Sequence, residues 1–396
     1  MIPWLLDWLS LNEFVRVPAA FDYVTSRMIL ALITSLVFCI AVGKPMIERL
    51  RRLKLGQQIR GEEFGKIAEL HSKKANTPTM GGLLILASLI LSLLLWMDLF
   101  HPFTWILCGT TLFLGAVGAL DDWLKIRGGN SKGLSPRYKF AAQALLACIL
   151  SVYLFYPLTE NSSQPIVKRF EKNSPTEQVH QLKRAEYAGL VYFPFFKRPI
   201  LELSGWGALL MALGIFLMIS GFSNAVNLTD GLDGLATGCM IPVAACLALV
   251  AFLSNHMHIA RYLDILYIEG GGEIAIYMSA LIGACLGFLW FNSYPSELFM
   301  GDVGSLALGG IIGVSAILLK REGFFLLIGG IFVAEALSVI LQVASYRWRN
   351  QKRIFLCAPL HHHFEYQGIP ETKIVMRFWI ASLLLAFIGL ISLKFQ

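Results

Sequence analysis

Residues 224–234 (NAVNLTDGLDG) form a short polar stretch between two long apolar runs. The stretch holds two asparagines, a threonine and two aspartates, and it has no lysine or arginine. Carboxylate and amide oxygens are ligands for hard cations, and glycine lets the backbone come close to a ligand. The stretch is therefore a candidate metal or substrate site.

Further polar clusters interrupt the apolar runs elsewhere in the chain. They are Lys73 with Lys74, Asp121 with Asp122, Asn292 with the turn before Asp302, and the run His361 to His363. Several carboxylates with amide oxygens and no cysteine suit Mg²⁺ or Mn²⁺ better than zinc. Lysines and histidines nearby would neutralise phosphate oxygens. This combination is typical of phosphoryl transfer, which needs positioning, a metal across the phosphates and cationic stabilisation.

Each cluster also has a plain structural explanation. The aspartate pair could close a helix at a membrane interface, although adjacent carboxylates repel and need a cation or a proton there. Asp302 could be an N-cap, and Asp230 and Asp233 could cap helical turns. The histidines could form a surface run, and the lysines could be ordinary positive charges of a cytoplasmic loop.

The composition predicts an all-α polytopic membrane protein. The chain has 396 residues, of which 56% are hydrophobic and 15% charged, whereas about a quarter of the residues of a soluble protein are charged. Apolar runs near the length that crosses a bilayer predict about ten transmembrane helices in one domain, residues 1–396. We expect them at about 26–43, 78–97, 103–120, 138–156, 205–222, 235–253, 273–291, 303–319, 324–345 and 374–394.

The basic residues predict the orientation of these spans. They concentrate in the odd-numbered connections, whereas the connection between spans 2 and 3 has none. Positive-inside reasoning puts the odd-numbered connections in the cytoplasm and both termini outside. All the polar clusters then fall on the cytoplasmic face, and the even-numbered connections hold no comparable clusters. We therefore expect one cytoplasmic-face site, assembled from several loops.

One connection, residues 157–204, carries seven basic residues on the predicted outer side. Long loops follow the positive-inside rule weakly, so the orientation stands. Its polar part, residues 159–187, is either a mobile segment or a small external appendage. The following residues 189–203 alternate aromatic and aliphatic side chains around two prolines, which predicts a short external β-hairpin.

The formal net charge of +7 comes without any nucleic-acid-binding motif. Anionic lipid headgroups of the bilayer or a phosphorylated substrate are therefore the expected partners, and nucleic acid is not. A transporter would be expected to carry ionisable groups deep within several spans. Only Glu335 lies mid-span, where we expect it to face other helices and pair with one of them, without an assigned role.

The chain contains five motifs in this order: KKANTPTMGG (73–82), GALDD (118–122), NAVNLTDGLDG (224–234), FMGD (299–302) and PLHHHFE (359–365). Together they resemble the motifs of the bacterial phospho-N-acetylmuramoyl-pentapeptide transferases. The wider superfamily, including N-acetylglucosamine-1-phosphate transferases, shares the aspartates, while the first and last motifs point to the muramoyl-pentapeptide branch. The resemblance covers nearly the whole chain except residues 159–187, which we predict to be an external insertion.

The resemblance implies a reaction at the bacterial inner membrane. UDP-N-acetylmuramoyl-pentapeptide and undecaprenyl phosphate would give lipid I and UMP, with Mg²⁺ as cofactor and a homodimer as the assembly. It implies catalytic roles for Asp121 as base, Asp302 as Mg²⁺ ligand, and Asp122, Asp230 and His361. It implies substrate binding by Lys74, Lys125, Lys139, Asn224, Asn227, Asp233, Asn292, Phe299, His362 and His363. Arg137 is the alternative to Lys139 as the match for one of these substrate-binding positions.

Two mechanisms stay open at this point. In one, the lipid phosphate attacks the sugar nucleotide directly; in the other, an aspartate first forms a covalent intermediate. Direct attack is favoured because a phosphate monoester, with a second pKa of about 6, is already ionised near neutral pH.

Overall fold

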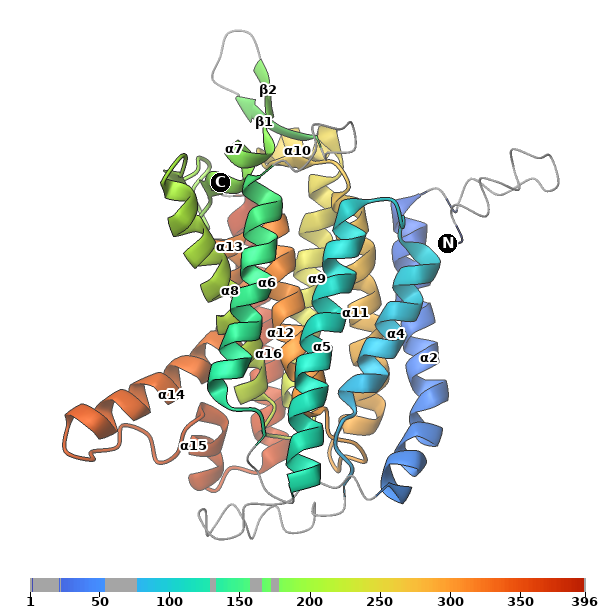
Figure 1. Cartoon of the computed structure of the whole chain (residues 1–396), viewed down its shortest axis with the longest axis vertical. Coiled ribbons are helices and arrows are strands. Elements are labelled where there is room, and N and C mark those ends of the chain that lie inside the picture. Colours follow the sequence, from blue (N-terminus) through green and yellow to red (C-terminus); the bar gives the residue numbers. More distant parts are fainter. Residues whose placement is uncertain are drawn as a thin grey trace, which may run out of the picture.

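A computed structural model describes residues 2, 21, 23–53, 77–128, 133–156, 166–171 and 178–394. Within these ranges, long helices form a bundle (Figure 1). They are α2 (Val24–Arg52), α4 (Gly82–Trp96), α5 (Pro102–Gly128), α6 (Pro136–Phe155), α8 (Gly207–Thr229), α9 (Leu235–Ser254), α11 (Gly271–Asn292), α12 (Gly301–Leu318), α14 (Gly330–Trp348) and α16 (Glu371–Lys394). The short helices are α7 (Arg184–Gly189), α10 (Met257–Leu263), α13 (Glu322–Ile328) and α15 (Leu360–Tyr366).

The helical bundle confirms the predicted polytopic all-α membrane fold. Nine of the described helices are long and apolar enough to cross a membrane, and α4 is a shorter apolar helix of 15 residues. Each predicted span coincides with a helix of the bundle. The ninth span is interrupted at Gly329, where α13 ends and α14 begins. A Gly-Gly pair has low helix propensity and is a common site of helix breaks.

Two predicted boundaries were wrong in ways that matter for the site. The helix α5 continues to Gly128, so Asp121 and Asp122 lie inside a helix and do not end it. The helix α8 continues to Thr229, so residues 224–229 are its last turns and do not belong to the connection. Polar side chains on the final turns of an apolar helix made both segments look like loops in the sequence.

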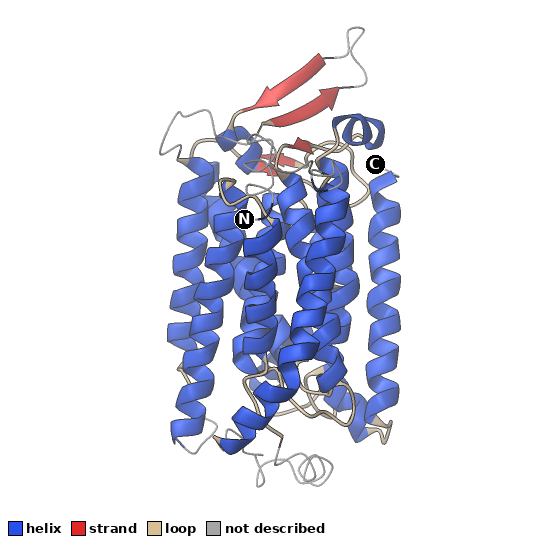
Figure 2. Ribbon diagram, turned by 90° about the vertical axis from the view of Figure 1, so that its right-hand side faces the viewer, coloured by secondary structure: helices blue, strands red, loops and turns tan. Residues whose placement is uncertain are grey.

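Small strands lie at one end of the bundle, which we call the strand end (Figure 2). The strands β1 (Val167–Glu171), β2 (Gln178–Leu182) and β5 (Tyr267–Ile268) form an antiparallel sheet in the order β2-β1-β5. The strands β3 (Leu190–Val191) and β4 (Leu201–Glu202) form the β-hairpin predicted for residues 189–203. The described part of the chain begins and ends at this end (Figure 1). The opposite end, which carries Asp121 and Asp302, is the aspartate end.

The helix α12 lies at the centre of the bundle, and 94% of its 18 residues are buried. Small residues on neighbouring helices let backbones approach closely inside a membrane. At Gly118 of α5, a Cβ atom would lie 2.2 Å from the carbonyl oxygen of Asp302. The missing side chain therefore allows the end of α5 to lie directly against the start of α12, and this contact brings the aspartates of the two helices together.

The contact at Gly118 gives a direct test of this packing. We expect Gly118→Ala to lower the free energy of unfolding by about 1–3 kcal/mol, because the added methyl overlaps the α12 backbone. The matched control is Gly109→Ala on the same helix, where a Cβ atom meets nothing within 4 Å. It should be neutral or stabilising by up to about 1 kcal/mol, because alanine favours helix. Thermal unfolding in detergent measures both; equal stability of the two variants would contradict the packing.

Candidate active site

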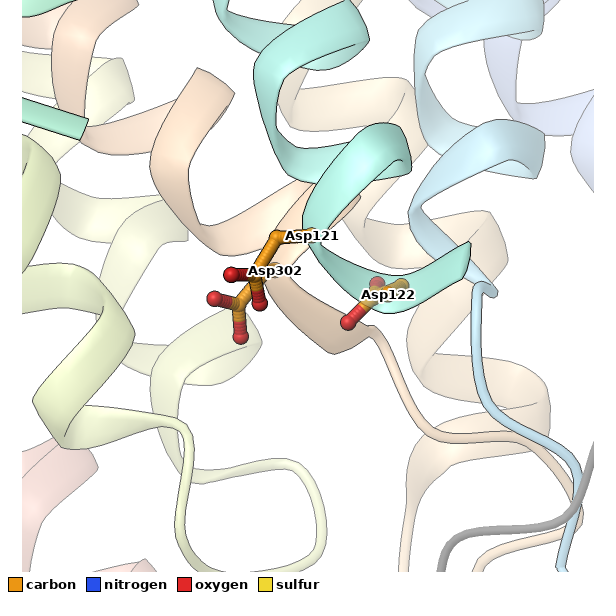
Figure 3. A group of neighbouring side chains, drawn as sticks. All are labelled: Asp121, Asp122 and Asp302. Carbon is orange, nitrogen blue, oxygen red and sulfur yellow. The ribbon is translucent and has the colours of Figure 1, made fainter. Parts of the chain in front are cut away.

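Three aspartates meet at the aspartate end of the bundle. Asp121 and Asp122 come from the last turns of α5, and Asp302 comes from the first turn of α12. All three side chains are buried, and one carboxylate oxygen of each lies within 4.8 Å of the others. Figure 3 shows Asp121 and Asp302 side by side, with Asp122 farther along α5, as expected for consecutive residues that point about 100° apart on a helix.

The start of α12 shows the environments of Asp302 and Asp122. Asp302 is not an N-cap, because Met300 occupies that position and Asp302 lies one residue inside the helix. Asp122 Oδ2 instead accepts a hydrogen bond from the backbone N–H of Val303, at 3.2 Å. The positive end of the α12 dipole therefore lies near the carboxylates of Asp122 and Asp302, an arrangement that favours negative charge on them.

Two lysines hold the three carboxylates together. Lys125, one turn after Asp121 on α5, lies 2.5 Å from Asp121 Oδ2, 3.0 Å from Asp302 Oδ1 and 3.6 Å from Asp122 Oδ1. Lys139 of α6 lies 2.9 Å from Asp121 Oδ1 and 2.6 Å from Asp302 Oδ2. Both lysines were predicted to bind substrate, and both reach the cluster.

The competing position, Arg137, is exposed two residues before Lys139 in α6. Two residues on a helix point in roughly opposite directions, so one of them faces the bundle and the other faces away. The structure therefore places Lys139, and not Arg137, at the aspartates.

The turn after α8 brings Asp230 to the same place. Its carboxyl group lies near the backbone N–H of Gly301, next to Asp302. Burial, and then the negative charges of Asp302, Asp122 and Asp233, raise the pKa of Asp230 to about 8. A further cation bound among these carboxylates would counteract this rise, because an opposite charge favours the ionised form.

Asp233 and Asn292 brace the connection between α11 and α12. Asp233 Oδ2 accepts a hydrogen bond from the N–H of Ser296, at 3.1 Å. The Asn292 side chain accepts from the N–H of Gly234, at 3.2 Å, and donates to the carbonyl of Leu298, at 2.9 Å. These bonds fix the Asp230–Gly234 turn against the segment that leads to Phe299, which is half-buried.

The remaining residues predicted to bind the nucleotide lie on the last turns of α8. Asn224 donates to Gln143 Oε1 of α6, at 3.1 Å, and to the Ser220 carbonyl, at 2.7 Å, so its amide group joins two helices. Asn227, one turn later, is half-buried. Lys74 lies outside the described residues.

The three histidines of α15 have different environments. His361 is buried, and its Nδ1 lies 3.2 Å from Glu335 Oε2 of α14. His362 Nδ1 lies 2.6 Å from Glu365 Oε2 on the same short helix. His363 Nδ1 accepts the N–H of Leu356, at 3.1 Å. A run of identical residues therefore divides into one buried and two half-buried side chains.

Sequence reasoning gave no role to Glu335 or Gln143, which contact the predicted site residues His361 and Asn224. The mid-span position of Glu335 was a signal, since a buried carboxylate needs a partner. Its partner lies 26 residues away on another helix, a distance that no local pattern reveals.

The chain is similar over its full length to known proteins. The profile of glycosyl transferase family 4 matches residues 104–320, and signature 1 of the phospho-N-acetylmuramoyl-pentapeptide-transferases matches residues 74–86. A phospho-N-acetylmuramoyl-pentapeptide-transferase of Protochlamydia amoebophila is 56% identical over 410 residues, covering 100% of each chain. The chain belongs to the phospho-N-acetylmuramoyl-pentapeptide transferase family. Relatives from Francisella tularensis and Thermodesulfovibrio yellowstonii, with the same name, are 43% identical and cover 100% and 98% of each chain.

Membership of the phospho-N-acetylmuramoyl-pentapeptide transferase family confirms the resemblance that the motifs indicated. The chain is a multi-pass membrane transferase of peptidoglycan synthesis, and its buried aspartate cluster is consistent with metal dependence. The family signature begins at Lys74.

The aspartate cluster predicts the effect of neutralising Asp302. We expect Asp302→Asn to lower transferase turnover at least about 100-fold while the protein stays folded in detergent, because an amide offers no charge to a cation or to the lysines. Asp264→Asn is the matched control: this residue ends α10 at the strand end in a left-handed conformation that asparagine also tolerates. It should keep full turnover. Normal turnover of Asp302→Asn would contradict the assignment of the site.

Proposed function

We propose that the chain transfers phospho-N-acetylmuramoyl-pentapeptide from its UDP-linked form to undecaprenyl phosphate, giving lipid I and UMP. The single observation that carries this proposal is the meeting of three buried carboxylates and two lysines at one end of a membrane-spanning bundle. A site at the end of such a bundle suits one soluble phosphorylated substrate and one lipid-borne substrate.

Mg²⁺ is the cofactor that we propose for this site. The three carboxylates form an oxygen-only donor set that fits a hard divalent cation, with Asp302 as the principal ligand and Asp121 and Asp122 beside it. When bound, the ion would neutralise charge on the phosphate oxygens. Three carboxylates and two ammonium groups sum to −1, so a divalent cation turns the cluster to +1, a sign that suits a diphosphate.

The lysines and Asp121 have distinct proposed parts in the reaction. Lys125 and Lys139, now paired with the carboxylates, would bind phosphate oxygens of the substrates once another cation joins the cluster. Asp121 accepts any proton that remains on the lipid phosphate. An oxygen of that phosphate attacks the β-phosphorus, the bond between this phosphorus and the bridging oxygen breaks, and UMP leaves with the electron pair.

The nucleotide would occupy the neighbouring pocket. We assign Asn224, Asn227, Asp233, Asn292 and Phe299 to this part of the site, with Lys74, His362 and His363 as further substrate contacts. The hydrogen bonds that tie Asn292 and Asp233 to the 230–234 turn support a pre-formed pocket, because they hold the turn and the segment before Phe299 together.

We infer the sides of the membrane from the charge pattern. The aspartate end is cytoplasmic, both termini are outside, and the membrane is the bacterial inner membrane. Support comes from the basic connections and from the position of the described chain ends at the strand end. The chain is one domain with an external insertion at residues 159–187, and the family resemblance suggests a homodimer.

The reaction itself is the test of the proposal. Purified protein with UDP-N-acetylmuramoyl-pentapeptide, undecaprenyl phosphate and Mg²⁺ should release UMP, and chelation of the metal should stop the release. UDP-N-acetylglucosamine should not replace the muramoyl substrate. Release of no UMP, or equal use of both sugar nucleotides, would overturn the proposed function.

The same preparation decides between the two mechanisms. With labelled UMP and no lipid phosphate, direct attack gives no label in the UDP-linked sugar, because no step can occur without the acceptor. A covalent aspartyl intermediate forms without the acceptor and reverses, so it would exchange the label. Exchange at a rate near turnover would contradict direct attack.

A further inference from the structure

The carboxylate of Glu335 binds one residue twice. Its Oε1 accepts the backbone N–H of His361, at 3.2 Å, and its Oε2 lies 3.2 Å from the ring Nδ1 of the same residue. Glu335 comes from α14 and His361 from the first turn of α15, and both side chains are buried. Two bonds from one carboxylate fix the position of the backbone and the rotation of the ring together.

A carboxylate in this position also determines which ring nitrogen carries hydrogen. An ionised carboxylate only accepts hydrogen bonds, so Nδ1 must be protonated when it pairs with Glu335. This holds for the neutral ring and for the imidazolium ion. In both forms Nε2 points away from Glu335. It is an acceptor in the neutral ring and a donor in the imidazolium ion, so only the imidazolium ion can donate a hydrogen bond to a phosphate oxygen.

His361 Nε2 is aimed at the turn after α8. A Cβ atom added to Gly231 would lie 2.3 Å from Nε2, so the nitrogen lies against the bare backbone of this residue. It is buried and has no hydrogen-bond partner among the residues that the structure describes. A buried polar atom without a partner is costly, and a polar ligand at this turn would remove the cost.

The turn connects His361 to the carboxylate cluster. Asp230, directly before Gly231, lies near the backbone N–H of Gly301, which precedes Asp302. The other two histidines differ from His361: His362 pairs with a carboxylate of its own short helix, and His363 binds the backbone of Leu356. His361 is therefore the histidine that a second helix, α14, orients toward the turn.

We propose that Glu335 is a positioning residue, which holds His361 as the imidazolium ion so that Nε2–H donates to a diphosphate oxygen of the sugar nucleotide at the Asp230–Gly231 turn. This inference rests on the proposed function for the identity of the ligand. The contact depends on phosphate oxygens and not on the nucleoside, and this difference can be measured.

Calorimetric binding of UDP and of uridine, both with Mg²⁺, tests the proposal on the purified full chain. We expect Glu335→Gln to weaken UDP binding about tenfold, because a hydrogen bond to a charged group is lost, and to leave uridine binding unchanged. His361→Gln should show the same pattern. The double variant should bind UDP no more weakly than His361→Gln alone, because Glu335 acts through His361. Equal weakening of uridine binding, or multiplied losses in the double variant, would overturn the proposal.

Ser338→Ala is the control for a general disturbance of α14, since Ser338 is buried three residues after Glu335 and its hydroxyl binds the Glu335 carbonyl. It should keep the UDP affinity; a tenfold loss would overturn the proposal. If Glu335→Gln does not fold, Glu335→Asp keeps the charge but retracts it from the ring. It should then weaken UDP binding with uridine unchanged, and wild-type affinity for UDP would overturn the proposal.

UMP release by the wild-type protein separates the two claims. If the wild type releases no UMP but Glu335→Gln still loses UDP binding selectively, the proposed reaction fails and the positioning role stands. If UMP is released and the UDP affinity of Glu335→Gln is normal, the reaction stands and the positioning role fails.

Discussion

Repulsion among three buried carboxylates is the constraint on which the rest of this site depends. Two like charges a few ångströms apart repel by about 3–4 kcal/mol at an effective dielectric constant of 20, and the oxygens of Asp121, Asp122 and Asp302 lie within 4.8 Å. Lys125 and Lys139 offset this repulsion by direct contacts to the cluster. Helix packing alone would not keep the three groups together, so cations are part of the structure of the site.

The fold provides this arrangement by bringing helix ends together. Close packing at Gly118 puts the last turns of α5 against the start of α12. Because helix α8 continues to Thr229, the turn with Asp230 lies at the same place. Figure 1 shows α14 leaning away from the bundle, with α15 beside it at the aspartate end. This tilt allows the carboxylate of Glu335, within α14, to reach His361 of the short helix α15.

Much of this could be predicted from the sequence, for physical reasons. A helix must be long and apolar to cross a bilayer, so each span leaves a readable run. Polar residues are costly within and beside such runs. The few that occur there, Asp121, Asp302 and the 224–234 stretch, were therefore recognised as candidate site residues. The sequence could not show that α8 continues to Thr229, because the same polar residues suit a helix end or a loop.

Contacts between remote residues were beyond sequence reasoning. The Glu335–His361 pair depends on the tilt of α14, and the Asn224–Gln143 bond depends on how α8 and α6 are rotated. The choice of Lys139 over Arg137 also depends on helix rotation, which places one residue inside and the other outside. Each of these is a three-dimensional relation between elements that are individually well predicted.

Binding of Mn²⁺, followed by electron paramagnetic resonance during titration of the purified protein, shows whether the cluster of Asp121, Asp122 and Asp302 holds a metal ion. The wild-type protein should bind Mn²⁺ at a site from which Mg²⁺ displaces it. Asp302→Asn should weaken this binding at least about tenfold, because a charged ligand is lost. Absence of Mn²⁺ binding by the wild type, or unchanged affinity in Asp302→Asn, would contradict the assignment of the aspartate cluster as the metal site.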